Sequence, residues 1–142
     1  MSQTSIAFDH IHIISADPEA TATWYVEVLG GEISERYELH GAPQISVALA
    51  GVILLIRGQR PGEHPSSKNG LANFADFASH DQWGTDHFGF RVTGDSAAFC
   101  DSLKGRGARF SVEPHEFLPG SCIAYLAAPD GVTVELVHAE EH

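Results

Sequence analysis

Two histidines and one glutamate stand where they could support metal chemistry. His10 and His87 each follow an aspartate in a strand-like segment, and Glu135 lies in a third such segment. Taken alone, each residue also fits a hydrogen-bonded or solvated structural role. The two histidines, however, occupy matching places in the two halves of the chain. Two neutral imidazoles and one carboxylate bind a divalent metal and leave positions open for water or substrate.

Side-chain alternation places these residues on one face of their strands. In residues 6–14, 86–92 and 132–138, one parity is apolar and fits packing beneath a helix. The opposite parity carries the polar side chains, namely His10, His12, His87, Arg91 and Glu135. A concave cavity lined by polar groups explains this pattern better than a dry core does.

His12 and Arg91 are the further candidates on this face. His12 lies about 6.6–6.8 Å beyond His10 along the strand. Because imidazole titrates near neutrality, we predict acid–base catalysis by His12, with a hydrogen bond to a neighbour as the alternative. Arg91 can hold a substrate carboxylate in a bidentate contact, and a structural salt bridge is the competing interpretation. His64, His80 and His115 are expected in surface loops, and His138 has the opposite parity to Glu135.

Turn and cap residues predict the elements that position these side chains. Asp17 is a candidate N-cap with Pro18 at the first helical position, and Gly30-Gly31 supplies a left-handed stop. Between them, Ala20, Trp24 and Val28 form a helical stripe with Tyr25 and Leu29 alongside. Three strands are expected next, at about 32–39, 44–50 and 51–57, the last two joined in a hairpin around Ala50-Gly51.

The second half repeats this order of elements. A strand at 86–92 precedes a helix at 95–107 and strands near 108–113, 121–127 and 132–138. The repetition predicts an α+β fold of two βαβββ modules that form a curved mixed sheet around a metal-binding cavity. We expect one domain over 1–142, with module 1 at about 6–57 and module 2 at about 86–138.

The intervening segment, about 58–85, is longer than an ordinary loop, and such loops in compact domains are usually functional or else disordered. It contains Phe74, Phe77 and Trp83, so we expect part of it to pack, as a lid or as a contact between subunits.

Composition excludes several classes of protein. The 142 residues are 43% hydrophobic and 19% charged, as expected for a globular domain large enough to bury a core. A formal charge of −11 argues against binding to nucleic acid or to an anionic membrane surface. No secretory signal or spanning segment is recognisable, and Cys100 and Cys122 fit a reducing compartment as small buried hydrophobes. We therefore expect a cytoplasmic protein.

Three motifs resemble the vicinal oxygen chelate superfamily, which includes glyoxalase I, methylmalonyl-CoA epimerase, extradiol dioxygenases, and fosfomycin and bleomycin resistance proteins. "DHIHIISADPEATATWYVEVLGG" is similar to the opening of the first module, and "TDHFGFRV" to that of the second. "AYLAAPDGVTVELVH" is similar to the closing hairpin. The resemblance covers the chain except for residues 58–85.

The resemblance implies paired βαβββ modules and a divalent metal held by His10, His87 and Glu135. The metal would be Fe, Mn, Zn, Ni or Co. Glyoxalase I and the epimerase carry a fourth ligand, Glu or Gln, on the last strand of the first module, where Leu54 occupies the matching place here. Tyr125 matches the aromatic residue that precedes the Pro-x-Gly turn of the extradiol dioxygenases, and we assign it to catalysis with His12.

The expected function is that of a metal-dependent enzyme of the lyase or isomerase type, acting on a small oxygen-bearing substrate chelated to the metal. An Fe(II)-dependent ring-cleaving dioxygenase is the first alternative, and a drug-binding resistance protein without chemistry is the second. The acidic surface would suit a cationic drug. We expect a homodimer that binds a small-molecule substrate and binds neither nucleic acid nor a membrane.

Overall fold

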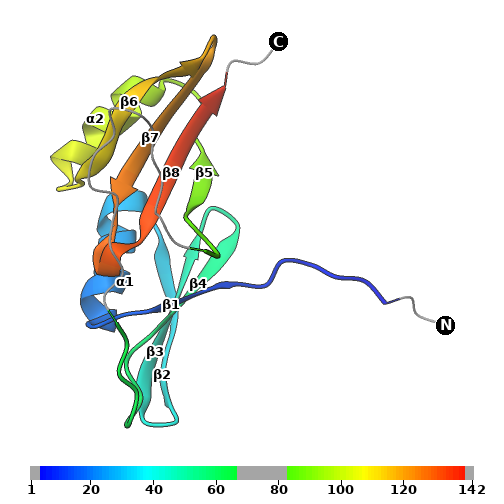
Figure 1. Cartoon of the computed structure of the whole chain (residues 1–142), viewed down its shortest axis with the longest axis vertical. Coiled ribbons are helices and arrows are strands. Elements are labelled where there is room, and N and C mark those ends of the chain that lie inside the picture. Colours follow the sequence, from blue (N-terminus) through cyan, green and yellow to red (C-terminus); the bar gives the residue numbers. More distant parts are fainter. Residues whose placement is uncertain (1–3, 67–82, 140–142) are drawn as a thin grey trace. The chain divides into compact units, whose positions relative to one another are not determined.

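A computed structural model describes residues 4–66 and 83–139 of the chain. The chain divides into two compact units, residues 1–64 and residues 65–142, which are described one at a time. Each unit contains a four-stranded mixed sheet and an α-helix (Figure 1). Among the described residues, no helix is long and apolar enough to cross a membrane.

The first unit follows the predicted order of strand, helix and three strands. Its elements are β1 (Ile11–Ile14), α1 (Pro18–Leu29), β2 (Glu32–Leu39), β3 (Ala42–Leu49) and β4 (Val52–Arg57). The order of strands across the sheet is β1-β4-β3-β2. β1 runs parallel to β4, and the other neighbours are antiparallel. Ala50 and Gly51 both have positive φ, as the predicted tight hairpin between β3 and β4 requires.

Helix α1 begins and ends where its cap residues predict. The side chain of Asp17 accepts a hydrogen bond from the backbone N–H of Ala20, and Gly30 ends the helix in the left-handed conformation. The predicted stripe was partly wrong, because Ala20 is exposed and Trp24 only half-buried. The buried face is centred instead on Tyr25 and includes Thr21, Ala22 and Val28.

The second unit repeats the first element by element. It contains β5 (Phe88–Arg91), α2 (Ser96–Gly105), β6 (Phe110–Leu118), β7 (Ser121–Ala127), a short 3₁₀ turn η1 (Pro129–Gly131) and β8 (Thr133–Ala139). Its strand order, β5-β8-β7-β6, is the same permutation as in the first unit, again with one parallel pair, β5 and β8. The α+β fold of two βαβββ modules is thereby confirmed.

Several boundaries differ from the prediction by a few residues, and two of the differences affect candidate residues. β1 starts at Ile11 and not near residue 6, and the preceding Ile6 and Phe8 are exposed. β6 extends to Leu118 and therefore includes His115, which was expected in a loop. Of the insertion, Phe74, Phe77 and His80 lie outside the described residues, and Trp83 is fully exposed.

Candidate metal and substrate site

The strand register of the second unit separates an apolar face from a polar face. Paired residues lie on the same side of a sheet, and Phe88 pairs with Val134 while Gly89 pairs with Glu135. Val134 and Leu136 are buried, whereas Glu135 remains partly exposed. The predicted alternation in β5 and β8 is therefore confirmed.

His87, just before β5, contacts a carboxylate on each of its ring nitrogens. Its Nδ1 lies 2.6 Å from Oδ2 of Asp86, and its Nε2 lies 3.1 Å from Oε2 of Glu135. All three side chains are about three-quarters buried or more. Asp86 can accept the Nδ1 proton, which leaves the Nε2 lone pair directed toward Glu135.

The distance between Nε2 of His87 and Oε2 of Glu135 fits a shared metal ion. Two atoms that each lie about 2.1 Å from one ion are about 3.0–3.4 Å apart for angles between a right angle and the tetrahedral value. The observed separation is 3.1 Å. A ligating histidine also commonly donates its other ring N–H to a carboxylate, as Asp86 allows here. These two residues therefore fit the predicted metal as a pair of ligands.

Tyr125 joins the same cluster from β7. It pairs with Glu135 across the β7–β8 ladder, and its ring centroid lies 5.1 Å from that of His87. Burial raises the pKa of the phenol, and the negative charges of Glu135 and Asp86 raise it further. Tyr125 therefore keeps its proton at neutral pH and can act as a hydrogen-bond donor.

Arg91 lies on the polar face but farther along β5. It pairs with Val137 and is exposed. It stands four residues beyond His87, which corresponds to roughly 13 Å along a parallel strand. Among the described residues Arg91 forms no ion pair. Its guanidinium is thus available for an anionic group, although the strand does not bring it to the His87 cluster.

In the first unit, His10 repeats the aspartate contact of His87. Its Nδ1 lies 2.6 Å from Oδ2 of Asp9, so an Asp-His pair opens both modules. The ring centroids of His10 and His12 are 5.9 Å apart in an edge-on arrangement. The two rings therefore lie close together, as the spacing of two residues predicts.

The prediction of which residue matches the family's fourth ligand needs a correction. Leu54 pairs with Ile11 and is fully buried with the apolar face, so it cannot stand beside the histidines. The partner of His12 is Leu55. In the second unit the same register step pairs Gly89 with Glu135, so Leu55 is the repeat equivalent of Glu135. The prediction was one residue out, and the corrected position is also apolar.

Two arginines near His12 were missed by the sequence prediction. Arg57 ends β4 on the face of Leu55 and His12, and Arg60 follows in the next turn. His12 is exposed, yet partial burial lowers its pKa, and the positive charges of Arg57 and Arg60, together with His10, lower it further. The sequence did contain a signal for Arg57. It is the one charged residue in the apolar run 52–57, and it has the same parity as Leu55.

Two other histidines have structural contacts. Nδ1 of His138 lies 2.8 Å from the backbone carbonyl oxygen of Val92, on the face opposite Glu135, which agrees with its omission from the site. Nδ1 of His115 lies 2.8 Å from the carbonyl oxygen of Glu113. His64 is exposed, as expected. None of these contacts belongs to the His87 cluster.

Within the described residues, no three His, Cys, Asp or Glu side chains are grouped around one metal position. In the second unit the reason is geometric, because Asp86 and Glu135 contact opposite nitrogens of His87. His10 belongs to the other unit, which is described by itself. The ligand set of His10, His87 and Glu135 therefore stays a prediction, of which the pair His87 and Glu135 is seen together.

Comparison with known proteins identifies the family. A model of the Glyoxalase/Bleomycin resistance protein/Dioxygenase superfamily matches residues 7–136, and the chain belongs to this superfamily. No curated protein matches the chain.

Solved structures show the same fold. A glyoxylase/bleomycin resistance protein/dioxygenase domain from Frankia sp. EAN1pec is 21% identical, with a TM-score of 0.70 over 99% of this chain and 95% of that one. The fosfomycin resistance protein FosX from Listeria monocytogenes is 14% identical, with a TM-score of 0.70 over 96% of both chains. A glyoxalase family protein from Enterococcus faecalis is 20% identical, with a TM-score of 0.67 over 92% of this chain and 96% of that one.

Proposed function

We propose that this protein is a divalent-metal-dependent enzyme of the lyase or isomerase type, which acts on a small organic substrate chelated to the metal through neighbouring oxygens. His10, His87 and Glu135 would hold the metal. The observation that carries the proposal is the 3.1 Å separation between Nε2 of His87 and Oε2 of Glu135, with Asp86 on the other ring nitrogen. Superfamily membership over residues 7–136 supports it.

The surrounding residues have distinct roles in this proposal. A bound divalent ion would polarise the substrate oxygens as a Lewis acid. His12, whose lowered pKa keeps it neutral at pH 7, would accept a proton from the substrate. Tyr125, whose raised pKa keeps it protonated, would donate a hydrogen bond to a substrate oxygen. Arg91, on the polar face of β5 and roughly 13 Å beyond His87 along the strand, would bind a carboxylate at the far end of the substrate.

Solved relatives support a divalent metal. FosX from Listeria monocytogenes has been crystallised with Mn(II) and sulfate, at 13% identity and a TM-score of 0.64. A point mutant of the same relative has been crystallised with Mn(II) and 1S,2S-dihydroxypropylphosphonic acid. In the present chain we expect Fe, Mn, Zn, Ni or Co, because imidazole and carboxylate ligands accept all of these ions.

Metal analysis of the purified protein tests the proposal. The protein is stripped with a chelator, reconstituted with each candidate ion and analysed for bound metal. We expect one ion per site in the wild type and a large loss of affinity in His10→Ala and in Glu135→Ala. His40→Asn is the matched control, since His40 lies in an exposed turn with positive φ, which Asn tolerates. Absence of stoichiometric metal in the reconstituted wild type would overturn the proposal.

Assembly and localisation are part of the same proposal. We propose that the two modules form one domain in a cytoplasmic homodimer, with a small molecule as the partner and neither nucleic acid nor membrane. Light scattering of the purified protein gives the oligomeric state, and a monomer at micromolar concentration would contradict the homodimer.

A further inference from the structure

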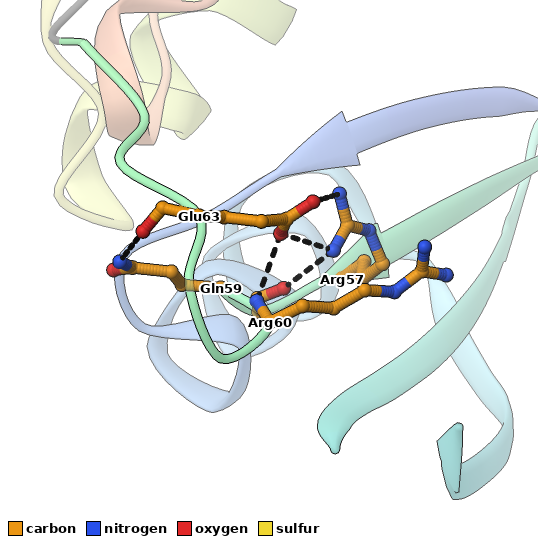
Figure 2. Close-up of polar contacts among 5 residues, drawn as sticks. Arg57, Gln59, Arg60 and Glu63 are labelled. Carbon is orange, nitrogen blue, oxygen red and sulfur yellow. Dashed lines mark hydrogen bonds and ion pairs between the residues drawn. The ribbon is translucent and has the colours of Figure 1, made fainter. Parts of the chain in front are cut away.

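The turn after β4 is organised around one carboxylate. Oε1 of Glu63 lies 2.8 Å from Nη1 of Arg57, and Oε2 lies 3.4 Å from its Nη2. Oε1 also accepts a hydrogen bond of 2.8 Å from the backbone N–H of Arg60 (Figure 2). The Glu63 carboxylate is thus already bound by Arg57 and by the backbone N–H of Arg60. The hydrogen bond from Arg57 lowers the pKa of Glu63.

Backbone contacts hold the same turn in place. The N–H of Glu63 donates to the carbonyl oxygen of Arg60 at 3.1 Å, and the side-chain amide of Gln59 donates to the carbonyl oxygen of Glu63. Nη1 of Arg57 also donates to the carbonyl oxygen of Gly58 at 3.3 Å. The two arginines therefore project from a fixed turn.

Within residues 4–66 and 83–139, no ion pair involves the guanidinium of Arg60. Its Nε is buried and has no hydrogen-bond partner among the described residues. Figure 2 shows the Arg60 side chain extending past Arg57, with dashed contacts only at its backbone. Two arginines against one glutamate leave a net charge of +1 in this turn, in a chain whose net charge is −11. The unpartnered Nε indicates that no described group neutralises this guanidinium, and an oxyanion bound at its Nη groups would do so.

The strand register of the first unit places Arg57 on the same face as His12. Arg57 is two residues beyond Leu55 on β4 and shares its face, and Leu55 is the register partner of His12. An anion bound at this turn would therefore lie at one end of the face that carries the two N-terminal histidines. Arg57 itself is nearly buried, so Arg60 is the arginine that a ligand can reach.

We propose that the turn 57–63 is an oxyanion subsite, in which Arg60 binds a carboxylate or phosphonate group and the Arg57–Glu63 pair holds the turn in position. The assignment of this oxyanion to the substrate rests on the proposed function. Binding of an anion at Arg60 does not rest on the proposed function, because it needs no metal. The substrate class would then be small organic acids that carry an anionic group as well as the chelating oxygens.

NMR titration of the metal-free full-length protein tests the subsite. The probes are propionate and methylphosphonate, with propionamide as the uncharged control, and the signal is the Nε–H resonance of each arginine. We expect a saturable shift at Arg60 with at least one of the two anions and none with propionamide. The anion that binds more tightly shows whether the subsite prefers a carboxylate or a phosphonate.

Arg60→Gln should weaken anion binding at least tenfold. Arg109→Gln, which removes the same charge from an exposed position in the second unit, should leave it unchanged. Backbone spectra show that each variant is folded. Equal binding by wild type and Arg60→Gln, or no shift with either anion, would overturn the inference.

Metal titration of the same samples separates the two proposals. Metal binding without anion binding overturns the oxyanion subsite alone. Anion binding at Arg60 without metal binding supports the subsite and overturns the proposed function.

Discussion

The imidazole of His87 contacts Asp86 on one side and Glu135 on the other, at 2.6 Å and 3.1 Å. If Asp86 fixes the ring with Nε2 toward the metal, removing its charge should weaken metal binding. For such supporting carboxylates the loss is about 10–100-fold in affinity. We therefore expect Asp86→Asn to weaken metal binding by this factor in a calorimetric titration.

The control for that measurement is Asp101→Asn, which removes an exposed carboxylate from α2. It should bind metal like the wild type. If Asp86→Asn also binds like the wild type, then Asp86 does not orient the ligand.

At the scale of single residues, the lowered pKa of His12 predicts how the rate depends on pH. Partial burial and the charges of Arg57, His10 and Arg60 lower its pKa below the ordinary 6.5. The lowered value means that His12 is neutral at pH 7 and gains its proton only in more acidic solution. A rate that requires neutral His12 should therefore be constant near pH 7 and fall as the pH drops through the lowered pKa. An NMR titration of the metal-free protein should give a midpoint below 6.5, and Arg60→Gln should raise it.

At the scale of elements, Gly89 permits the close pairing of β5 with β8. A Cβ added at Gly89 would lie 3.0 Å from the carbonyl oxygen and 3.1 Å from Cβ of Glu135. Since the carbonyl oxygen belongs to the backbone, the strands themselves must shift. We expect Gly89→Ala to lower the free energy of unfolding by about 1–3 kcal/mol, as overpacking commonly does, and to weaken metal binding by displacing Glu135.

Urea unfolding measures the first effect of Gly89→Ala, with Gly105→Ala as its control. A Cβ at Gly105 meets nothing within 4 Å, and the residue ends α2, so this change should be neutral or slightly stabilising. Equal stability of the two variants would contradict the steric account.

The elements show what the sequence allowed us to predict. Asp17, Pro18 and Gly30 determine the helix ends locally, so the bounds of α1 were predicted correctly. The prediction of the apolar face of α1 was partly wrong. Tyr25 and Trp24 are neighbours, and only packing decides which ring is buried. Leu54 was misassigned for a similar reason, since strand register is set by partners distant in sequence. The turn of Arg57 and Glu63 depends on side-chain contacts that no periodicity encodes.

At the scale of the whole molecule, binding of the proposed metal would stabilise the folded chain. A ligand present at about 100 times its dissociation constant adds about 2.7 kcal/mol to the free energy of unfolding. For a protein of this size that corresponds to a rise in Tm of roughly 5–10 °C. Thermal unfolding of the stripped protein, with and without metal, should show this rise.

If the proposed ligands hold the metal, the rise in Tm should disappear in His10→Ala as well as in Glu135→Ala. It should persist in His40→Asn. A full rise in His10→Ala would mean that the metal is bound by the second unit alone.

The repeat has a consequence for how readily this protein could acquire another chemistry. At one register step the second module pairs Gly89 with Glu135, whereas the first module pairs His12 with Leu55. A single Leu55→Glu change would place the new carboxylate next to the His12 imidazole, which would compete with a metal for it. A four-ligand site therefore lies two substitutions away, His12→Gly together with Leu55→Glu. His12→Gly alone would remove the proposed proton acceptor without adding a ligand, and Leu55→Glu alone would pair the new carboxylate with the His12 imidazole.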